Sequence, residues 1–247
     1  MNKQSVIFRD LGKMDYQSAW DYQERLLQEN VRRKSLVFSR ESGVGEDLLQ
    51  TPDSGLPTQH YLLIVEHPPV YTLGKSGNMD HVLLGEKELE EKGIQFFRTN
   101  RGGDITFHGE QQIVGYPILD LERFYTDIGK YLRNLEEVII QTLADYHIKG
   151  DRSPGETGVW IDPDLPGKER KICALGVRTS RWITMHGFAF NVNTDLAYFN
   201  NIIPCGIQNK QVTSLEKELG RKIDFEEAKE RVKKNFEKVF EVELVNS

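Results

Sequence analysis

The chain has 247 residues, a length that fits one large α/β or α+β unit with a well-developed core. Its hydrophobic and charged fractions, 38% and 28%, are those of an ordinary globular protein, and its formal net charge of -6 argues against general nucleic-acid binding. No stretch approaches the roughly 18 apolar residues of a membrane span, and the first ten residues, MNKQSVIFRD, contain no apolar signal core. We therefore expect a single domain over residues 1–247, located in the cytoplasm and without a nucleic-acid or membrane partner.

The first third of the chain predicts one long helix followed by two short strands. Asp15 is placed to cap a helix whose apolar residues follow helical spacing as far as Val31, with Gln23 as a polar break. Residues 41–59 are rich in Gly, Pro and Ser and predict a surface loop. Residues 61–65 and 70–73 predict buried strands on either side of a His-Pro-Pro step, because two prolines cannot both lie inside a central strand.

The rest of the chain alternates irregularly between elements: helices over 86–92 and 127–147, and strands at 95–98, at 113–121 and over 158–192, the last interrupted by a polar loop at 162–170. Asp224 predicts the start of a final helix, with Glu227 completing a capping-box-like pair. Neither a steady βαβ alternation nor a repeat is present. An α+β fold, with a mixed β-sheet flanked by helices, fits this order better than a doubly wound fold.

Two cysteines are too few for a disulfide framework or a cysteine metal cluster, so each is either a small buried hydrophobe or a reactive thiol. Cys205 lies between a proline and a glycine, the surroundings of an exposed turn in which a substrate can approach the sulfur closely. Cys173 lies in the apolar run Ile-Cys-Ala-Leu, as a structural cysteine in a strand would. Cys205 is therefore the candidate nucleophile.

A free thiol is mostly protonated at neutral pH, so a nucleophilic cysteine needs a base or a positive neighbour. The candidates are Lys171, His67, His108 and His186. Lys171 opens an otherwise apolar strand. It is either a strand-end residue that reaches out to water or a desolvated amine that can take a proton, and the residues alone leave both interpretations open.

The glycine-rich turn RGGDITFHG at residues 101–109 concentrates backbone donors, a guanidinium and an imidazole. Such a turn can line an anion or a carbonyl oxygen, and a plain hairpin turn is equally compatible with it. It contains neither GxxxxGK[ST] nor GxGxxG, so it matches no phosphate-binding loop of those kinds. The six histidines and two cysteines show no HExxH or CxxC spacing, so no metal site is predicted.

Four segments occur in one order over about residues 61–215: EHPPVYTLG at 66–74, RGGDITFHG at 101–109, KICALGV at 171–177, and HGFAFNVN at 186–193 followed by PCG at 204–206. Together they resemble the lipoyl(octanoyl) transferase family of the biotin/lipoate protein ligase superfamily. The resemblance implies that superfamily's fold, with Cys205 as the nucleophile that carries an acyl thioester and Lys171 as its base. It also implies an acyl pocket formed by three segments: Arg101, Gly102, Gly103, Asp104, Ile105, Thr106, Phe107 and His108; Ala174, Leu175 and Gly176; and Gly187, Phe188 and Ala189.

The implied reaction moves an octanoyl or lipoyl group from octanoyl acyl carrier protein to Cys205, and then to a lysine of a lipoyl-accepting domain. Such domains belong to the 2-oxoacid dehydrogenases and to the glycine cleavage H protein. Lys171 takes the thiol proton first; later Lys171, or a water that it orders, takes the proton of the incoming ammonium, and no cofactor or metal is required. Candidates for a local docking patch for acidic carriers are Arg101, Arg178, Arg181 or nearby lysines.

One segment departs from the family pattern, because Gly109-Glu110-Gln111-Gln112 stands where the family usually has Gly-Pro-Gly-Gln. The proline and glycine favour a particular turn, so their loss bears on the backbone of the pocket loop. It is also the feature that favours a non-catalytic protein binding acylated carrier domains. Two more functions compete with octanoyl transfer: an ATP-dependent lipoate or biotin protein ligase, which needs no thiol, and an amidotransferase that works between lipoyl domains.

We predict that Cys205→Ser and Cys205→Ala abolish acyl transfer, whereas Cys173→Ser leaves most of it, because only Cys205 lies in a turn open to substrate. Transfer is measured as acylation of a lipoyl domain, with circular dichroism confirming that each variant is folded. Equal loss of transfer in folded Cys205 and Cys173 variants would contradict the assignment.

Overall fold

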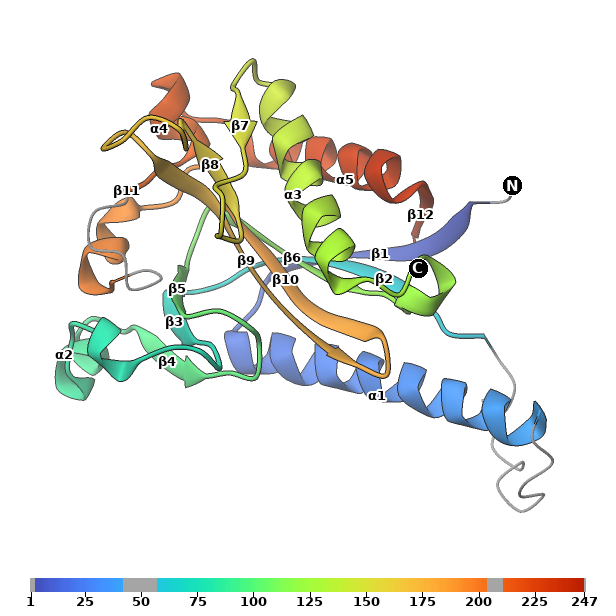
Figure 1. Ribbon diagram of the computed structural model, residues 1–247. Helices are drawn as coiled ribbons and strands as arrows, with labels where there is room; N and C mark the ends of the chain where they lie inside the picture. Colours follow the sequence, from blue (N-terminus) through green and yellow to red (C-terminus); the bar gives the residue numbers. More distant parts are fainter. Residues whose placement is uncertain (1–2, 42–56, 204–210, 247) are drawn as a thin grey trace.

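The computed structural model describes residues 3–41, 57–203 and 211–246, and side chains 37–41 are left out of the description (Figure 1). The described residues form a nine-stranded mixed sheet in the order β12-β1-β2-β6-β10-β9-β8-β7, with β11 paired to β9. In that order the strands are β12 (Val242–Asn246), β1 (Gln4–Lys13), β2 (His60–Glu66), β6 (Gln112–Ile118), β10 (Ile183–Asn191), β9 (Arg170–Ser180), β8 (Val159–Ile161), β7 (Gly150–Asp151) and β11 (Gln211–Val212). The predicted α+β architecture, a mixed sheet with flanking helices, is confirmed.

A second sheet has three strands, β4 (Gln95–Arg98), β3 (Val70–Leu73) and β5 (Ile105–His108), with β3 in the middle. β3 runs parallel to β4 and antiparallel to β5. The glycine-rich turn therefore does not close a hairpin, because the two strands that flank it do not pair with each other. It crosses the end of β3, where Gly74 N donates to Asp104 O at 3.1 Å. The His-Pro-Pro step carries the chain from β2 in the large sheet to β3 in the small one.

Helices cover both faces of the large sheet (Figure 1). On one face, α1 (Tyr16–Glu41) buries Ala19, Leu26 and Leu27 in a cluster with residues of β2, β6 and β10. On the other, α3 (Ile128–Ala144) and α5 (Phe225–Phe240) enclose the larger core. The shorter helical segments are η2 (Met79–His81), α2 (Glu86–Glu91), η3 (Leu121–Arg123), η4 (Leu196–Asn201) and α4 (Leu215–Leu219).

Three aspartates begin the three long helices by accepting hydrogen bonds from backbone N–H groups of the first turn, which have no partner within the helix. Asp15 accepts from Ser18 N at 2.9 Å, and Asp127 and Asp224 act in the same way. The predicted capping-box pair at Asp224 is wrong in its second half. The carboxylate of Glu227 accepts from Arg231 at 2.5 Å instead of turning back to the cap.

Most of the predicted loop at 41–59 lies outside the described residues. Within the described part, no helix is both long enough and apolar enough to cross a membrane.

Candidate active site

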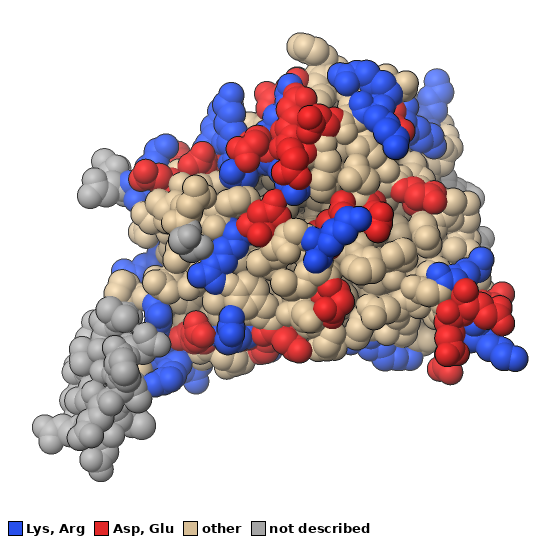
Figure 2. Space-filling view, turned by 180° about the vertical axis from the view of Figure 1, so that it is seen from behind, with Lys and Arg blue, Asp and Glu red and all other residues tan. Residues whose placement is uncertain are grey.

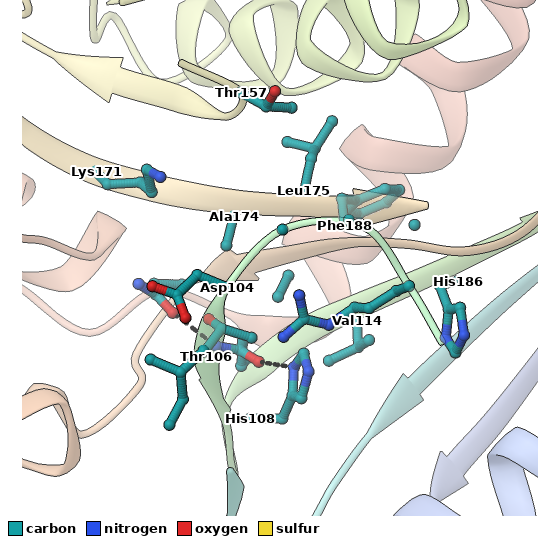
Figure 3. Close-up of a pocket in the computed structure, with 18 of the residues that line it drawn as sticks. Asp104, Thr106, His108, Val114, Thr157, Lys171, Ala174, Leu175, His186 and Phe188 are labelled. Atoms are coloured by element: carbon teal, nitrogen blue, oxygen red, sulfur yellow. Dashed lines mark hydrogen bonds between the residues drawn. The ribbon is translucent and has the colours of Figure 1, made fainter. Parts of the chain in front are cut away.

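A cavity of about 530 Å³ opens where the small sheet meets β9 and β10 of the large one, and this volume is typical of small-molecule sites (Figure 3). The three segments predicted to line the acyl pocket converge on it. All of their predicted residues except Gly102 and Phe107 line the cavity, and so does Lys171. Figure 3 shows Lys171 at one end and His186 at the other, with Ala174, Leu175 and Phe188 between them.

Gly102 and Phe107 do not line the cavity, and they contact the segments that form its walls. Gly102 N donates to Val177 O at 2.9 Å and so links the glycine-rich turn to β9. The ring of Phe107 lies in a separate apolar cluster, stacked on Tyr198 with 4.6 Å between ring centroids. Because neighbouring strand residues point to opposite sides, Thr106 and His108 face the cavity while Phe107 does not.

Lys171 lies near the start of β9, paired with Trp160 of β8 on one side and Val212 of β11 on the other. The side chain is half-buried, and its Nζ lies 4.6 Å from the centroid of the Trp160 ring. Gly158 has φ +125°, and a Cβ there would lie 3.3 Å from Lys171 Cε and 2.7 Å from Cys173 O. A glycine at position 158 therefore leaves room for the stem of the lysine.

The two cysteines cannot be compared directly, because Cys205 lies outside the described residues. Cys173 is fully buried in the main core, and this burial raises the pKa of its thiol, as expected for a structural cysteine. The described chain stops at Ile203, whose N–H donates to His81 O at 2.9 Å. It resumes at Gln211, and the next residue, Val212, lines the cavity. The nucleophilic role of Cys205 stays a prediction.

The guanidinium of Arg101 lies between the two sheets, with 7% of the residue exposed. It donates to Thr72 O at 2.5 Å, to Thr72 Oγ1 at 2.9 Å and to Gly102 O at 3.0 Å. A Cβ on Gly74 or Gly176 would lie 2.9 or 3.2 Å from Nη1, so these glycines admit the guanidinium.

This burial excludes Arg101 from the predicted docking patch. Arg178 is paired with Glu24 at 2.7 Å, and Arg181 donates to Ser35 in α1. The predicted patch is therefore wrong for Arg101, while the other two side chains also make contacts within the fold.

His108 is oriented from both sides of its ring. Its Nδ1 lies 3.0 Å from Gln112 Oε1 and its Nε2 lies 3.3 Å from Thr72 Oγ1. An amide oxygen only accepts, so Nδ1 carries the proton and Nε2 accepts from the Thr72 hydroxyl. The hydroxyl oxygen in turn accepts from Arg101. Burial, together with nearby positive charge, lowers the pKa of His108 well below its ordinary value, so the ring is neutral.

The same polar chain continues to the backbone of the lysine strand. Gln112 Nε2 donates to Asn191 Oδ1 at 2.8 Å, and Asn191 Nδ2 donates to Thr213 O at 3.0 Å. Thr213 N donates to Lys171 O at 2.9 Å. A continuous set of hydrogen bonds thus links the glycine-rich turn, the cavity wall and the strand that carries Lys171.

The turn that departs from the family pattern keeps its connection to the cavity. Gln111 adopts φ +60°, a left-handed conformation at the position where the family has glycine. Several hydrogen bonds hold it: Gln111 N donates to Glu66 Oε2 at 2.7 Å, and Asn193 donates to Gln111 Oε1 at 2.8 Å and to Gln111 O at 3.1 Å. Gln112 is left in place against His108, so the altered sequence no longer favours a non-catalytic protein.

The other two histidines proposed as bases are also neutral and already engaged. His67 Nδ1 lies 2.7 Å from Met14 O, so this nitrogen donates, and its Nε2 accepts from Tyr116 at 2.8 Å. His186 Nε2 lies 2.8 Å from Asn100 Oδ1. Burial lowers the pKa of His67 to about 4 and that of His186 to about 3. Lys171 is the remaining candidate among the four, and its role as a base stays a prediction.

Several residues that line the cavity were not predicted. Tyr16, Val114, Tyr116 and His81 come from α1, β6 and η2, and no motif marks them. Gln112 of β6 ends the segment that departs from the family pattern. His81 is paired with Asp104, its Nδ1 lying 2.5 Å from Oδ2. Across the described residues, no three His, Cys, Asp or Glu side chains are arranged to hold a metal ion.

Comparison with known proteins shows the family of the chain and the solved structures that share its fold. Residues 15–237 match the family described as the lipoyl protein ligase A/B catalytic domain, and the chain belongs to this family. The fold is also that of a bipartite lipoate protein ligase from Thermoplasma acidophilum, with a TM-score of 0.65 at 14% identity over 100% of this chain and 87% of that one. A biotin protein ligase from Aquifex aeolicus has a TM-score of 0.51 at 14% identity, over 95% of this chain and 70% of that one.

In sequence, the chain is more similar to proteins named octanoyltransferase than to these two ligases. The chain is 56% identical over 245 residues to an octanoyltransferase of Christiangramia forsetii, covering 99% of both chains. It is 57% identical over 246 residues to an octanoyltransferase of Flavobacterium johnsoniae, covering 99% of this chain and 100% of that one. The predicted resemblance is confirmed, and it extends beyond residues 61–215 to nearly the whole chain.

The buried neutral histidines predict that the free energy of unfolding falls as the pH falls from about 6.5 towards 4. The folded-state pKa of His67, about 4, lies below its ordinary 6.5. The unfolded chain therefore binds protons more readily in this window, and protonation favours unfolding. His67→Gln should reduce the slope of the free energy of unfolding against pH by up to about 1.4 kcal/mol per pH unit, the value for one bound proton.

The measurement is the urea unfolding midpoint and m-value at several pH values between 7 and 4. His147→Gln is the matched control, because it removes an exposed imidazole that lies just after α3 and outside the cavity. An identical slope in wild type and His67→Gln would show that His67 is not held neutral by the fold.

Proposed function

We propose that the chain transfers an octanoyl or lipoyl group from acyl carrier protein to a lysine of a lipoyl domain, through a thioester on Cys205. The observation that carries this proposal is the convergence of Lys171 and the three predicted pocket segments on one cavity. The described residues next to the Cys205 segment, Ile203 and Val212, contact His81 and Lys171 at the same cavity. The name octanoyltransferase, shared by relatives 56% and 57% identical over nearly the full length, supports the same reaction.

The cavity offers an apolar path for the acyl chain that begins at Lys171. From Lys171 to Gly176 the strand rises about 17 Å, with Val114, Leu175 and Phe188 along the path (Figure 3). Tyr116 lies beside His186 at the far end, with 6.5 Å between their ring centroids, and each is at most 3% exposed. Burial of the seven alkyl carbons of an octanoyl group contributes about 5 kcal/mol, or roughly 10³- to 10⁴-fold in affinity.

The chemistry consists of two acyl transfers. In the first, Lys171 takes the thiol proton of Cys205, the thiolate attacks the carbonyl carbon of the carrier thioester, and the departing carrier thiolate takes up that proton. In the second, the acceptor amine attacks the enzyme thioester, Lys171 takes a proton from the acceptor nitrogen, and the departing Cys205 thiolate takes up that proton. Acceptors would be lipoyl domains of 2-oxoacid dehydrogenases and the glycine cleavage H protein. The cytoplasmic location and the single catalytic domain also stay predictions.

The direct test is to incubate the purified protein with octanoyl acyl carrier protein alone and to measure its intact mass. We expect a covalent octanoyl adduct on Cys205 that hydroxylamine removes, and that passes to a lipoyl domain added later without ATP. Cys205→Ala should form no adduct.

Three further outcomes distinguish the competing functions. Modification of the domain that needs ATP and free acid indicates a ligase, and an adduct that forms only from an acylated lipoyl domain indicates an amidotransferase. A complex that never changes mass indicates a binding protein. An adduct on Cys173 would keep acyl transfer but overturn the choice of nucleophile.

Lys171→Ala should reduce the transfer rate by about 10²-fold or more, as the loss of a general base does. Lys171→Arg should not restore it, because a guanidinium does not release its proton at neutral pH. Single-turnover acylation by octanoyl acyl carrier protein measures the first step. If Lys171→Arg keeps near-wild-type turnover, Lys171 is not the base.

A further inference from the structure

The proton balance of the second acyl transfer calls for one more base than Lys171. An acceptor lysine arrives as an ammonium and ends as an amide N–H, so its nitrogen loses two protons. One of them ends on the Cys205 thiolate and the other must leave the site. A single amine holds only one of these protons at a time. This argument rests on the proposed function, because it concerns the acceptor half of that reaction.

Among the histidines and tyrosines that line the cavity in the described part of the chain, one side chain is suited to receive the second proton. His108 has both ring nitrogens in hydrogen bonds and is 6% exposed, while His186 is 1% exposed. Burial raises the pKa of Tyr16 to about 12 and that of Tyr116 well above its ordinary value, so neither is a base. His81 has 23% of its side chain exposed and can therefore exchange protons with solvent.

The ring of His81 is held by a carboxylate. Its Nδ1 lies 2.5 Å from Asp104 Oδ2, and a carboxylate oxygen only accepts, so Nδ1 carries the proton and Nε2 is the accepting nitrogen. Within the described part of the chain, Nε2 makes no hydrogen bond. This is how a carboxylate orients a catalytic imidazole and stabilises the imidazolium that forms. Asp104 Oδ1 is buried and finds no donor among the described residues, which leaves His81 as the group that this carboxylate binds.

Backbone hydrogen bonds connect His81 and Asp104 to neighbouring segments of the cavity. His81 ends η2, its carbonyl accepts from Ile203 N, and Asp104 O accepts from Gly74 N at 3.1 Å. Both side chains line the cavity that Lys171 lines. Figure 3 shows Asp104 facing the strand that carries Lys171 and Ala174 from the opposite wall.

We propose that His81 Nε2 removes a proton from the acceptor ammonium, with Asp104 as a positioning residue. An N–H bond of the ammonium breaks and an Nε2–H bond forms. The free amine then forms the N–C bond as the S–C bond of the thioester breaks. The remaining proton passes through Lys171 to the Cys205 thiolate, and the His81 imidazolium releases its proton to water.

The test separates the two half-reactions. Acyl-enzyme is made with octanoyl acyl carrier protein, freed of carrier, and mixed with a lipoyl domain in a single turnover followed by intact mass. His81→Gln should slow discharge to the domain by about 10²-fold, as the loss of a general base does, and should slow acyl-enzyme formation much less. Its discharge rate should rise about tenfold per pH unit, because only acceptor lysine that has already lost its proton reacts. Asp104→Asn should show a smaller loss with the same steeper pH dependence.

Two controls exclude a purely structural effect. Hydroxylamine, which is largely uncharged at neutral pH, should discharge the wild-type and His81→Gln acyl-enzymes at similar rates. His147→Gln, which removes an exposed imidazole outside the cavity, should match wild type. If His81→Gln does not fold, His81→Asn and Asp104→Asn carry the same comparison.

Discharge by His81→Gln at the wild-type rate, or an equal loss with hydroxylamine, would overturn the inference. Failure of the wild-type protein to form any acyl-enzyme would instead overturn the proposed function.

Discussion

The cavity depends on a buried cation, the guanidinium of Arg101 between the small and the large sheet. Figure 2 shows the molecule from behind, with charged side chains of both signs on the face that it presents. A buried charge is costly unless its donors are hydrogen-bonded, and Arg101 donates to both oxygens of Thr72 and to Gly102 O. The hydroxyl of Thr72 then orients His108. The two sheets can approach this closely because Gly74 and Gly176 lack a Cβ beside the guanidinium. The glycine-rich turn thus connects the two sheets, and this connection places His108 and Asp104 at the cavity.

Strand β9 connects the glycine-rich turn to Lys171, the base of the proposed reaction. Lys171 lies near its first residue, Cys173 is in the core, and Ala174, Leu175 and Gly176 form the cavity wall. The loop behind Lys171 is held by a buried carboxylate on α3.

That carboxylate, Glu136, accepts from Gly158 N and from Arg152 Nε, each at 3.0 Å, and forms an ion pair with Arg133 at 2.7 Å. A carboxylate buried in this way is favourable because several donors surround it. The position of Gly158, which passes along the lysine stem, therefore depends on α3, an element that contributes no residue to the cavity.

Much of this arrangement is predictable from the sequence, because the responsible signals are local. Aspartate caps mark the starts of the long helices, and periodic apolar residues mark their buried faces. Phe107 was misplaced because a motif names consecutive residues while strand alternation sends neighbours to opposite sides. The hairpin interpretation was wrong because β3, which precedes both strands in the sequence, lies between β4 and β5 in the small sheet. The His81–Asp104 pair has no local signal at all, since tertiary structure alone brings η2 against the glycine-rich turn. Cys205 was singled out by its flanking residues and remains an inference from them.

The claim that the cavity beside Lys171 receives the acyl chain is tested most directly by covalent mapping. Octanoyl acyl carrier protein with a diazirine on the terminal carbon is loaded onto the protein, irradiated, and the digest is analysed by mass spectrometry. The account predicts labels on residues that line the cavity beyond Lys171, at Val114, Phe188, Tyr116 or His186. Labels confined to surface residues, or to the apolar cluster around Tyr71 and Phe107, would contradict it.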